Sequence, residues 1–439
     1  VCSSDLDLIW ENIDAEQVPD LQAVLSLNNM ELILSRMSKS QAVDTMTIED
    51  LFAEAYPNGF SKDNVKYIER SNAEVASINY TSGTTGFSKG VITPANALAG
   101  NILFGFKTGL VYPGCRHVAF LPLAHAYGCA FDFLACLAAG GHTHLIGRTP
   151  SPKILMKAFA EVKPTLILSV PLILEKIYKK MIQPQISRTA VSWVLKMPLL
   201  DKVVLNKIRE TLVNAFGGEF SEIIIGGAPL NAEVEAFLKR LKFPLTVGYG
   251  MTETAPLISF AHWDKFKSQS CGQVLDGLME VRIASPDGDG VGEIQVRGEH
   301  VMLGYYKNEQ ATKESFTEDG WLRTGDLGTV DADGFIYIKG RCKTMLLGAS
   351  GQNIYPEEIE AKINNMPYVL ESLVLQKDTK LVALVCPDFE AVDADHLTQT
   401  QLEVLMEENR KLVNQQLATY EQINEIRIFN HEFEKTPKK

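Results

Sequence analysis

Residues 80–90 combine hydroxyl, glycine and lysine side chains at a density that suits the binding of phosphate. The segment reads Tyr-Thr-Ser-Gly-Thr-Thr-Gly-Phe-Ser-Lys-Gly, directly after the strand-like run 75–79. Glycines let the backbone approach an anion closely, hydroxyls donate hydrogen bonds to its oxygens, and Lys89 supplies a positive charge. The pattern therefore predicts a phosphate-binding loop made of Thr81, Ser82, Gly83, Thr84, Thr85, Gly86 and Lys89.

This loop differs from the P-loop of kinases and GTPases. The P-loop requires Gly-x-x-x-x-Gly-Lys followed by Ser or Thr. Here the glycine that precedes Lys89 is Gly86, and Gly90 stands where the P-loop has a hydroxyl residue. A flexible Ser/Gly linker is the alternative interpretation, which the position between a strand-like run and an apolar run disfavours.

Further glycine-rich and charged motifs follow this loop along the chain. They are Gly226–Leu230, Gly248–Thr254, Gly292–Ile294 leading to Gly304-Tyr305, Trp321–Leu327, Gly340–Lys343 and Tyr355–Glu360. From about Ala73 to the C-terminus, their order and spacing resemble those of the adenylate-forming superfamily. That superfamily includes acyl-CoA synthetases, luciferases and the adenylation domains of peptide synthetases. Within it, the set looks most like bacterial long-chain fatty acyl-CoA synthetases.

The resemblance implies a ligase that uses ATP, Mg²⁺ and CoA. A carboxylate is a poor acyl donor, so such enzymes first couple it to AMP with loss of pyrophosphate and then transfer the acyl group to a thiol. The expected substrate is a medium- or long-chain fatty acid. Alternatives of the same chemistry are an aryl or short-chain acid, or a carrier protein as the acyl acceptor. From a different class, the chain could be a catalytically impaired nucleotide-binding fragment.

The resemblance also assigns roles to single residues. Thr252 matches the threonine that contacts the α-phosphate, and Glu253 matches the carboxylate that helps to hold Mg²⁺. Asp326 matches the acceptor for both ribose hydroxyls, and Arg341 a second ribose contact. The segment expected against adenine consists of Gly227, Ala228 and Pro229, with Tyr249 nearby. Taken alone, Thr252 would also fit a helix cap, Glu253 and Arg341 a solvated surface charge, and Asp326 a turn.

The acid is expected beside His125 and Gly250. His125 matches an aromatic or histidine residue at the mouth of the acyl pocket, although a packed core histidine is an equal alternative. Phe131-Asp132 is not interpreted as the peptide-synthetase aspartate that binds an amino group, because that aspartate would fall near Tyr127. An unpaired buried acid would also be costly beside a fatty chain. An amino-acid substrate is therefore disfavoured.

Alternating strand-like and helix-like segments predict an α/β protein with a mostly parallel sheet covered on both faces. The strand-like segments are 117–121, 143–146, 165–170, 222–225 and 245–247, and helix starts are expected at Ser151-Pro152, Pro171 and Asn231. Residues 273–339 carry turn motifs between short strands, which predicts an antiparallel β-rich subdomain. Beyond Lys343, helices near 356–365 and 399–418 and strands at 371–376, 381–386 and 425–429 predict a small α+β unit.

In the superfamily this architecture is a large N-terminal domain, here 1–342, and a C-terminal lid, here 343–439, with Lys343 as the hinge. CoA is expected near Gly348 and Gly351. Both domains are expected to be truncated: few residues precede the phosphate loop, and the chain stops at Lys438-Lys439. Family members continue there with a lysine that neutralises charge during adenylation, so Lys438 or Lys439 would have to substitute for it.

Composition agrees with this interpretation. A net charge of −12 and a pI near 5.3 argue against binding of nucleic acid. Seven cysteines without Cys-x-x-Cys spacing indicate free thiols in a cytoplasmic protein rather than disulfides or a zinc site. His142-x-His144 is read as a solvated strand end rather than a metal site. Segment 118–139 is read as core rather than as a membrane span. For the apolar residues 193–200, peripheral contact with a membrane is the alternative to a place in the core.

Overall fold

The computed structural model describes residues 23–25, 32–35, 48–66, 69, 71–81, 88–146, 150–186, 200–348, 351–378 and 380–433. The chain divides into two compact units, 1–70 and 71–439. Sequence analysis did not anticipate this division, and the predicted boundary at 342/343 stays a prediction. Within the described residues, no helix combines the length and the apolar character needed to cross a membrane.

The first unit contains a small antiparallel hairpin and short helices. Strands β1 (Ala23–Leu25) and β2 (Leu32–Ser35) pair with each other, and α2 (Ile48–Ala55) and the 3₁₀-helix η2 (Lys62–Asn64) follow. The rings of Phe52, Tyr56 and Phe60 lie 4.9–5.8 Å apart between centroids. Three aromatic residues thus form a local cluster at the end of this unit.

The second unit begins with the strands that flank the predicted phosphate loop. β3 (Val75–Thr81) and β4 (Lys89–Pro94) are antiparallel, and β15 (Gly304–Tyr305) pairs with the other edge of β4. Thr81 is the register partner of Lys89. The predicted strand before the loop is therefore confirmed. Residues 82–87, which include Ser82, Gly83, Thr84, Thr85 and Gly86, lie outside the described residues.

The predicted parallel strands are confirmed, but the expectation of one sheet is corrected, because they form two separate sheets. β5 (Arg116–Ala119) pairs with β6 (His142–Leu145), while β7 (Ile167–Ser169), β8 (Ile223–Ile225) and β9 (Leu245–Val247) form the other sheet. Every residue of β7, β8 and β9 is buried. Continuous apolar runs of this kind are typical of parallel strands that are covered on both faces.

The three predicted helix starts are also confirmed. Ser151 caps α5 (Pro152–Val162), Pro171 opens α6 (Pro171–Ile177), and Asn231 accepts hydrogen bonds from two backbone amides at the start of α10 (Ala232–Arg240). Helix α6 continues at Tyr178 as a π-helix, η4 (Tyr178–Ile182). Between residues 95 and 215, the sequence analysis did not predict the helices α3 (Ala95–Lys107), η3 (a π-helix, Gly128–Ala135), α4 (Cys136–Ala138), α7 (Gln183–Ile186) and α9 (Leu200–Ala215).

The β-rich region has the predicted antiparallel pairing. β13 (Met279–Ala284), β14 (Gly292–Gly298), β16 (Leu322–Val330) and β17 (Ile336–Arg341) form one sheet in that order. A second sheet contains β10 (Tyr249–Gly250), β11 (Leu257–Phe260) and β12 (Gln273–Val274). The 3₁₀-helix η5 (Thr252–Thr254) lies between β10 and β11, and α11 (Glu309–Ser315) lies between β15 and β16.

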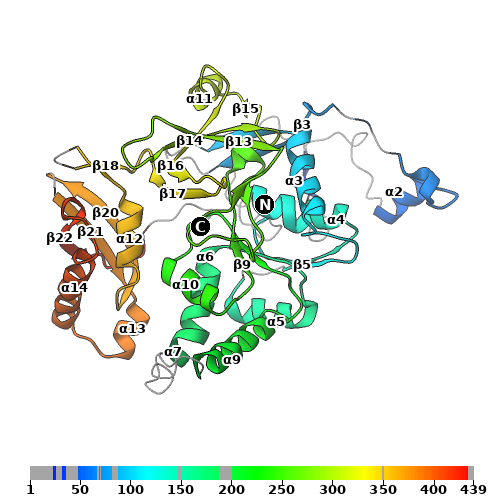
Figure 1. Ribbon diagram of the computed structural model, residues 1–439. Coiled ribbons are helices and arrows are strands. Elements are labelled where there is room, and N and C mark those ends of the chain that lie inside the picture. Colours follow the sequence, from blue (N-terminus) through cyan, green and yellow to red (C-terminus); the bar gives the residue numbers. More distant parts are fainter. Residues whose placement is uncertain are drawn as a thin grey trace. The chain divides into compact units, whose positions relative to one another are not determined.

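The C-terminal residues form the predicted α+β arrangement. β20 (Val369–Lys377), β21 (Lys380–Pro387) and β22 (Ile423–Ile428) make one sheet, with α12 (Pro356–Ile363) packed against β20 and α14 (Gln399–Asn414) against β22 (Figure 1). Smaller elements are β18 (Leu346–Leu347), β19 (Asn353–Ile354), α13 (Phe389–Ala394) and the 3₁₀-helix η6 (Thr419–Glu421). Buried apolar side chains form two clusters, one within 91–336 and one within 354–423.

Close packing at the end of α9 yields a prediction about stability. Gly217 has φ +94°, and a Cβ there would lie 2.5 Å from the carbonyl oxygen of Phe159. Gly109 has φ +74° but open space around it. We expect Gly109→Ala to cost about 1 kcal/mol for its backbone conformation, and Gly217→Ala about 2–4 kcal/mol because the clash adds to that cost. Urea denaturation measures the free energy of unfolding of both variants. Equal losses of stability would show that the clash at residue 217 is absent.

Candidate functional site

Two motif loops leave the sheet of β7, β8 and β9 at the carboxyl ends of its strands. The amide of Gly226, after β8, donates to the carbonyl of Ser169 at the end of β7 (3.1 Å). The amide of Gly248, after β9, donates to the carbonyl of Ile225 at the end of β8 (2.9 Å). Loops that leave this edge of an α/β sheet commonly form ligand sites. Gly227, Ala228 and Pro229 are exposed in the first of these loops.

Asp326 is a buried carboxylate with two partners. Its Oδ2 accepts a hydrogen bond from the hydroxyl of Tyr249 (2.7 Å), and its Oδ1 lies 3.2 Å from Nε of Arg341. Arg341 is the register partner of Asp326 across β16 and β17. Burial raises the pKa of Asp326, while Tyr249 and Arg341 act to lower it. Both partners favour the ionised form, which is the form that accepts hydrogen bonds from hydroxyl groups.

Glu253 lies on η5 and is also buried. Its Oε1 accepts a hydrogen bond from the hydroxyl of Tyr305 (2.8 Å), and within the described residues its other carboxylate oxygen accepts none. The ammonium group of Lys89 lies 4.8 Å from the centre of the Tyr305 ring. Tyr305 therefore contacts both Lys89 of the predicted phosphate loop and the carboxylate to which the family resemblance assigned Mg²⁺. A carboxylate oxygen without another hydrogen bond fits the ligand chemistry of Mg²⁺.

Sequence analysis quoted Tyr305 within a motif but gave it no role. Its contact with Glu253 spans 52 residues of chain, so no local spacing could reveal it. The signal in the sequence is Gly304, because β15 can lie close to Thr312 only where residue 304 has no side chain. A Cβ on Gly304 would lie 2.7 Å from a methyl carbon of Thr312.

Thr252 and Gly250 belong to the same segment as Glu253. Thr252 is the first residue of η5 and is partly exposed. Packing alone requires glycine at position 250, because a Cβ there would lie 2.0 Å from the carbonyl oxygen of Pro256. Its predicted contact with the acid is untested and stays a prediction.

Segment 125–128 lies against the end of β8. The hydroxyl of Tyr127 donates to the carbonyl of Ile224 (3.0 Å), and its ring lies 3.2 Å from the position of a Cβ on Gly226. Sequence analysis gave no role to Tyr127, which contacts the carboxyl end of β8. His125, two positions earlier, is partly buried beside it. Asp132, which was not assigned to a substrate, is 1% exposed and lies beside His117.

The predicted hinge and CoA residues belong to the C-terminal part of the chain. Lys343 is exposed and lies two residues after the end of β17. The amide of Gly348 donates to the carbonyl of Gln352, and that of Gly351 to the carbonyl of Gly348, in the turn between β18 and β19. Lys438 and Lys439 lie outside the described residues. All of these roles stay predictions.

Comparison with known proteins identifies relatives of this chain. The sequence matches the family described as AMP-binding enzyme over residues 12–306. It is 33% identical over 349 residues to the long-chain-fatty-acid–CoA ligase FadD15 of Mycobacterium bovis, covering 73% of this chain and 56% of that protein. It is 30% identical over 336 residues to the long-chain-fatty-acid–CoA ligase ACSBG2 of Gallus gallus, covering 70% and 43%. The chain thus spans about half the length of the curated relatives it matches.

A solved structure shares the fold. ATP-bound MatB from Rhodopseudomonas palustris superimposes with a TM-score of 0.65 and 26% sequence identity, covering 84% of this chain and 67% of that one. The mixed α/β architecture expected from the sequence is therefore confirmed, and so is the resemblance on which it rested. Fold, motif order and sequence identity agree: this chain belongs to the family of AMP-binding enzymes.

Proposed function

We propose that the chain catalyses ATP-dependent activation of a medium- or long-chain fatty acid as acyl-AMP and its transfer to CoA. The observation that carries the proposal is the buried Asp326 carboxylate, held by Tyr249 and Arg341. These three residues come from three motifs that the sequence assigned to nucleotide binding. The relatives named as long-chain-fatty-acid–CoA ligases supply the substrate class.

The nucleotide would be held by its ribose and its base. Asp326 uses one lone pair of each oxygen for Tyr249 and Arg341, and each carboxylate oxygen offers a further acceptor site for a ribose hydroxyl. Adenine would lie against Gly227, Ala228 and Pro229, whose small side chains permit close approach. The buried Tyr249 keeps Asp326 fixed before the nucleotide arrives, so less ordering is needed on binding.

The phosphates would lie toward β4 and η5. Lys89 and the loop that begins at Thr81 would neutralise the β- and γ-phosphates, and Thr252 would contact the α-phosphate. Glu253, with one oxygen held by Tyr305, would bind Mg²⁺ through the other. When bound, Mg²⁺ would neutralise charge on the phosphate oxygens.

Two successive transfers follow from this arrangement. A carboxylate oxygen of the fatty acid, near His125 and Gly250, attacks the α-phosphorus, and the bond to pyrophosphate breaks. The deprotonated thiol of CoA, near Gly348 and Gly351, then attacks the acyl carbon, and AMP leaves with the electrons of the acyl–oxygen bond. Lys343 is the proposed hinge between the two steps, and Lys438 or Lys439 the proposed charge partner in the first.

Exchange of labelled pyrophosphate into ATP, measured with a panel of acids, tests the proposal. Each methylene buried in an apolar pocket contributes up to ~0.8 kcal/mol, so affinity should rise up to about fourfold per methylene until the pocket is full. We expect dodecanoate to support exchange at lower concentration than hexanoate. Faster exchange with benzoate or acetate would contradict a fatty acid as substrate. ATP binding without exchange for any acid would indicate a nucleotide-binding fragment.

Removal of the ribose acceptor gives a second prediction. We expect Asp326→Ala to weaken AMP binding by about 1–3 kcal/mol, or about one to two decades in the dissociation constant, because two hydroxyls lose their acceptor. Isothermal titration calorimetry measures this directly. Asp333→Ala is the control, since Asp333 is an exposed carboxylate of the same β-rich region that pairs with Lys267. Unchanged AMP affinity in a folded Asp326→Ala variant would remove Asp326 from the site.

The Tyr305 hydroxyl gives a third prediction. Tyr305→Phe keeps the ring beside Lys89 but removes the donor that orients Glu253. We expect the Mg²⁺ concentration for half-maximal exchange to rise about tenfold, the scale of effect for groups that orient metal ligands. Tyr306→Phe is the matched control, because Tyr306 is the exposed neighbour. The orienting role is wrong if Tyr305→Phe and Tyr306→Phe need the same Mg²⁺ concentration as the unmodified chain.

A further inference from the structure

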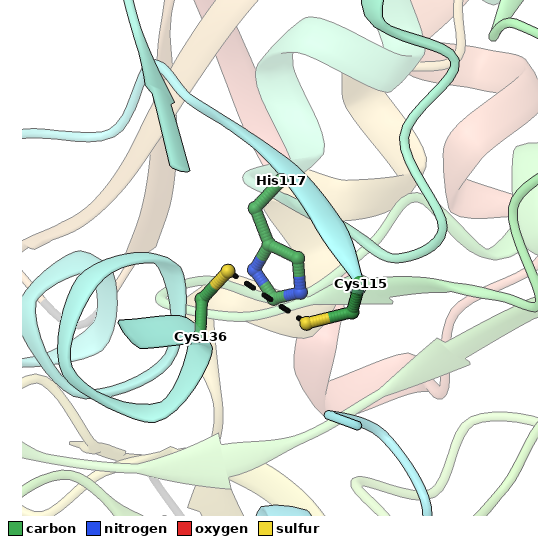
Figure 2. Close-up of side chains that lie close together, drawn as sticks. All are labelled: Cys115, His117 and Cys136. Atoms are coloured by element: carbon green, nitrogen blue, oxygen red, sulfur yellow. Dashed lines mark hydrogen bonds between the residues drawn. The ribbon is translucent and has the colours of Figure 1, made fainter. Parts of the chain in front are cut away.

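Two cysteines and one histidine meet inside the protein. Cys115 precedes β5, His117 lies within β5, and Cys136 begins α4. Their sulfur and nitrogen atoms all lie within 4.8 Å of one another, and all three side chains are fully buried. Figure 2 shows them converging from the strand and the helix, with the two sulfur atoms on either side of the imidazole ring.

The backbone around Gly141 holds both cysteines in place. The amide of Gly141 donates to the carbonyl of Cys136 (2.8 Å), and the amide of His142 donates to the carbonyl of Cys115 (2.7 Å). A Cβ on Gly141 would lie 2.4 Å from the sulfur of Cys115 and 2.8 Å from that of Cys136. Glycine is therefore needed for the two sulfur atoms to approach each other here. Cys115 and His117 are two residues apart on extended chain, so both side chains face Cys136.

The two sulfur atoms of this cluster contact each other, but the polar atoms of His117 and Asp132 lack hydrogen bonds. Neither ring nitrogen of His117 and neither carboxylate oxygen of Asp132 has a hydrogen-bond partner within the described residues. His117 is 0% exposed and Asp132 1%, and Nδ1 lies 3.6 Å from Oδ1. Burial of such groups without partners is costly, and an apolar core would be more stable. The cost falls if a cation binds the ring through Nε2 while Nδ1 donates to Asp132.

The spacing of the sulfur atoms indicates which kind of cation fits. They lie 3.7 Å apart, too far for a disulfide, whose sulfurs are about 2.0 Å apart. Two thiolates bound at ~2.3 Å to a tetrahedral ion are separated by about 3.8 Å. Thiolate and imidazole ligands select Zn²⁺ or Cu(I) over Mg²⁺ and Ca²⁺.

We propose that Cys115, Cys136 and His117 bind Zn²⁺ through two sulfur atoms and Nε2, with Asp132 orienting the ring. Binding releases the two thiol protons to solvent, and the two thiolates then balance the charge of the ion. The carboxylate of Asp132 behind a metal-bound histidine is a common arrangement at zinc sites. The ion would connect β5 to α4. This proposal does not depend on the proposed ligase activity.

Zinc binding by the full chain tests the proposal. The chain is reduced, stripped with a chelator, incubated with Zn²⁺ in the presence of Mg²⁺, and separated from free metal by gel filtration. We expect one zinc per chain by mass spectrometry of the metal, and a sulfur-to-metal charge-transfer band when Co²⁺ replaces Zn²⁺. Cys115→Ser and Cys136→Ser should lose both signals. Cys129→Ser is the matched control, because this partly buried thiol of η3 lies outside the cluster and should retain the zinc.

Asp132→Asn should keep the stoichiometry and weaken zinc affinity about 10–100-fold, because only the orienting carboxylate changes. Zinc retention by the unmodified chain tests the proposal even if a cysteine variant fails to fold. No retained zinc and no cobalt–sulfur band in the reduced chain would overturn the proposal. Retention of one zinc by folded Cys115→Ser and Cys136→Ser variants would overturn it as well.

Discussion

A buried carboxylate must be matched by donors, and the site around Asp326 is arranged to meet that requirement. Tyr249 reaches Asp326 across 77 residues of chain, and Arg341 reaches it from the adjacent strand. Because Tyr249 lies two residues after β9, this one carboxylate links the parallel β7–β9 sheet to the antiparallel sheet that contains β16 and β17. The loops that carry the family motifs leave from both sheets, so their mutual placement depends on this contact.

A second set of contacts, made by Tyr305, connects Glu253 to the strand that follows the predicted phosphate loop. Tyr305 hydrogen bonds to Glu253 and lies beneath Lys89, so one side chain joins β15, η5 and β4. The backbone supports the same connection, because the amide of Tyr306 donates to the carbonyl of Gly90 (2.7 Å) and that of Met302 to the carbonyl of Glu253 (2.8 Å). The candidate site is therefore built from pairs of residues far apart in sequence, held by a few directional contacts.

Sequence reasoning succeeded where local chemistry determines structure. Capping by Ser151 and Asn231, the proline that opens α6, and the apolar runs of β7, β8 and β9 are local signals, and the structure confirms them. It failed where distant segments meet. The π-helix η3 has no local signature, and the approach of Cys136 to Cys115 depends on Gly141 leaving space between two elements. The absence of Cys-x-x-Cys spacing therefore gave no sign of the proposed metal site, whose three residues only the fold brings together.

The central claim is that segments 226–230, 248–254 and 323–327 form one nucleotide site. Hydrogen–deuterium exchange of the full chain with and without saturating AMP tests it most directly, because amides that become covered or rigid exchange more slowly. The account predicts slower exchange in all three segments together, with little change in β20, β21 and β22. Unchanged exchange in these segments when AMP is bound would contradict it.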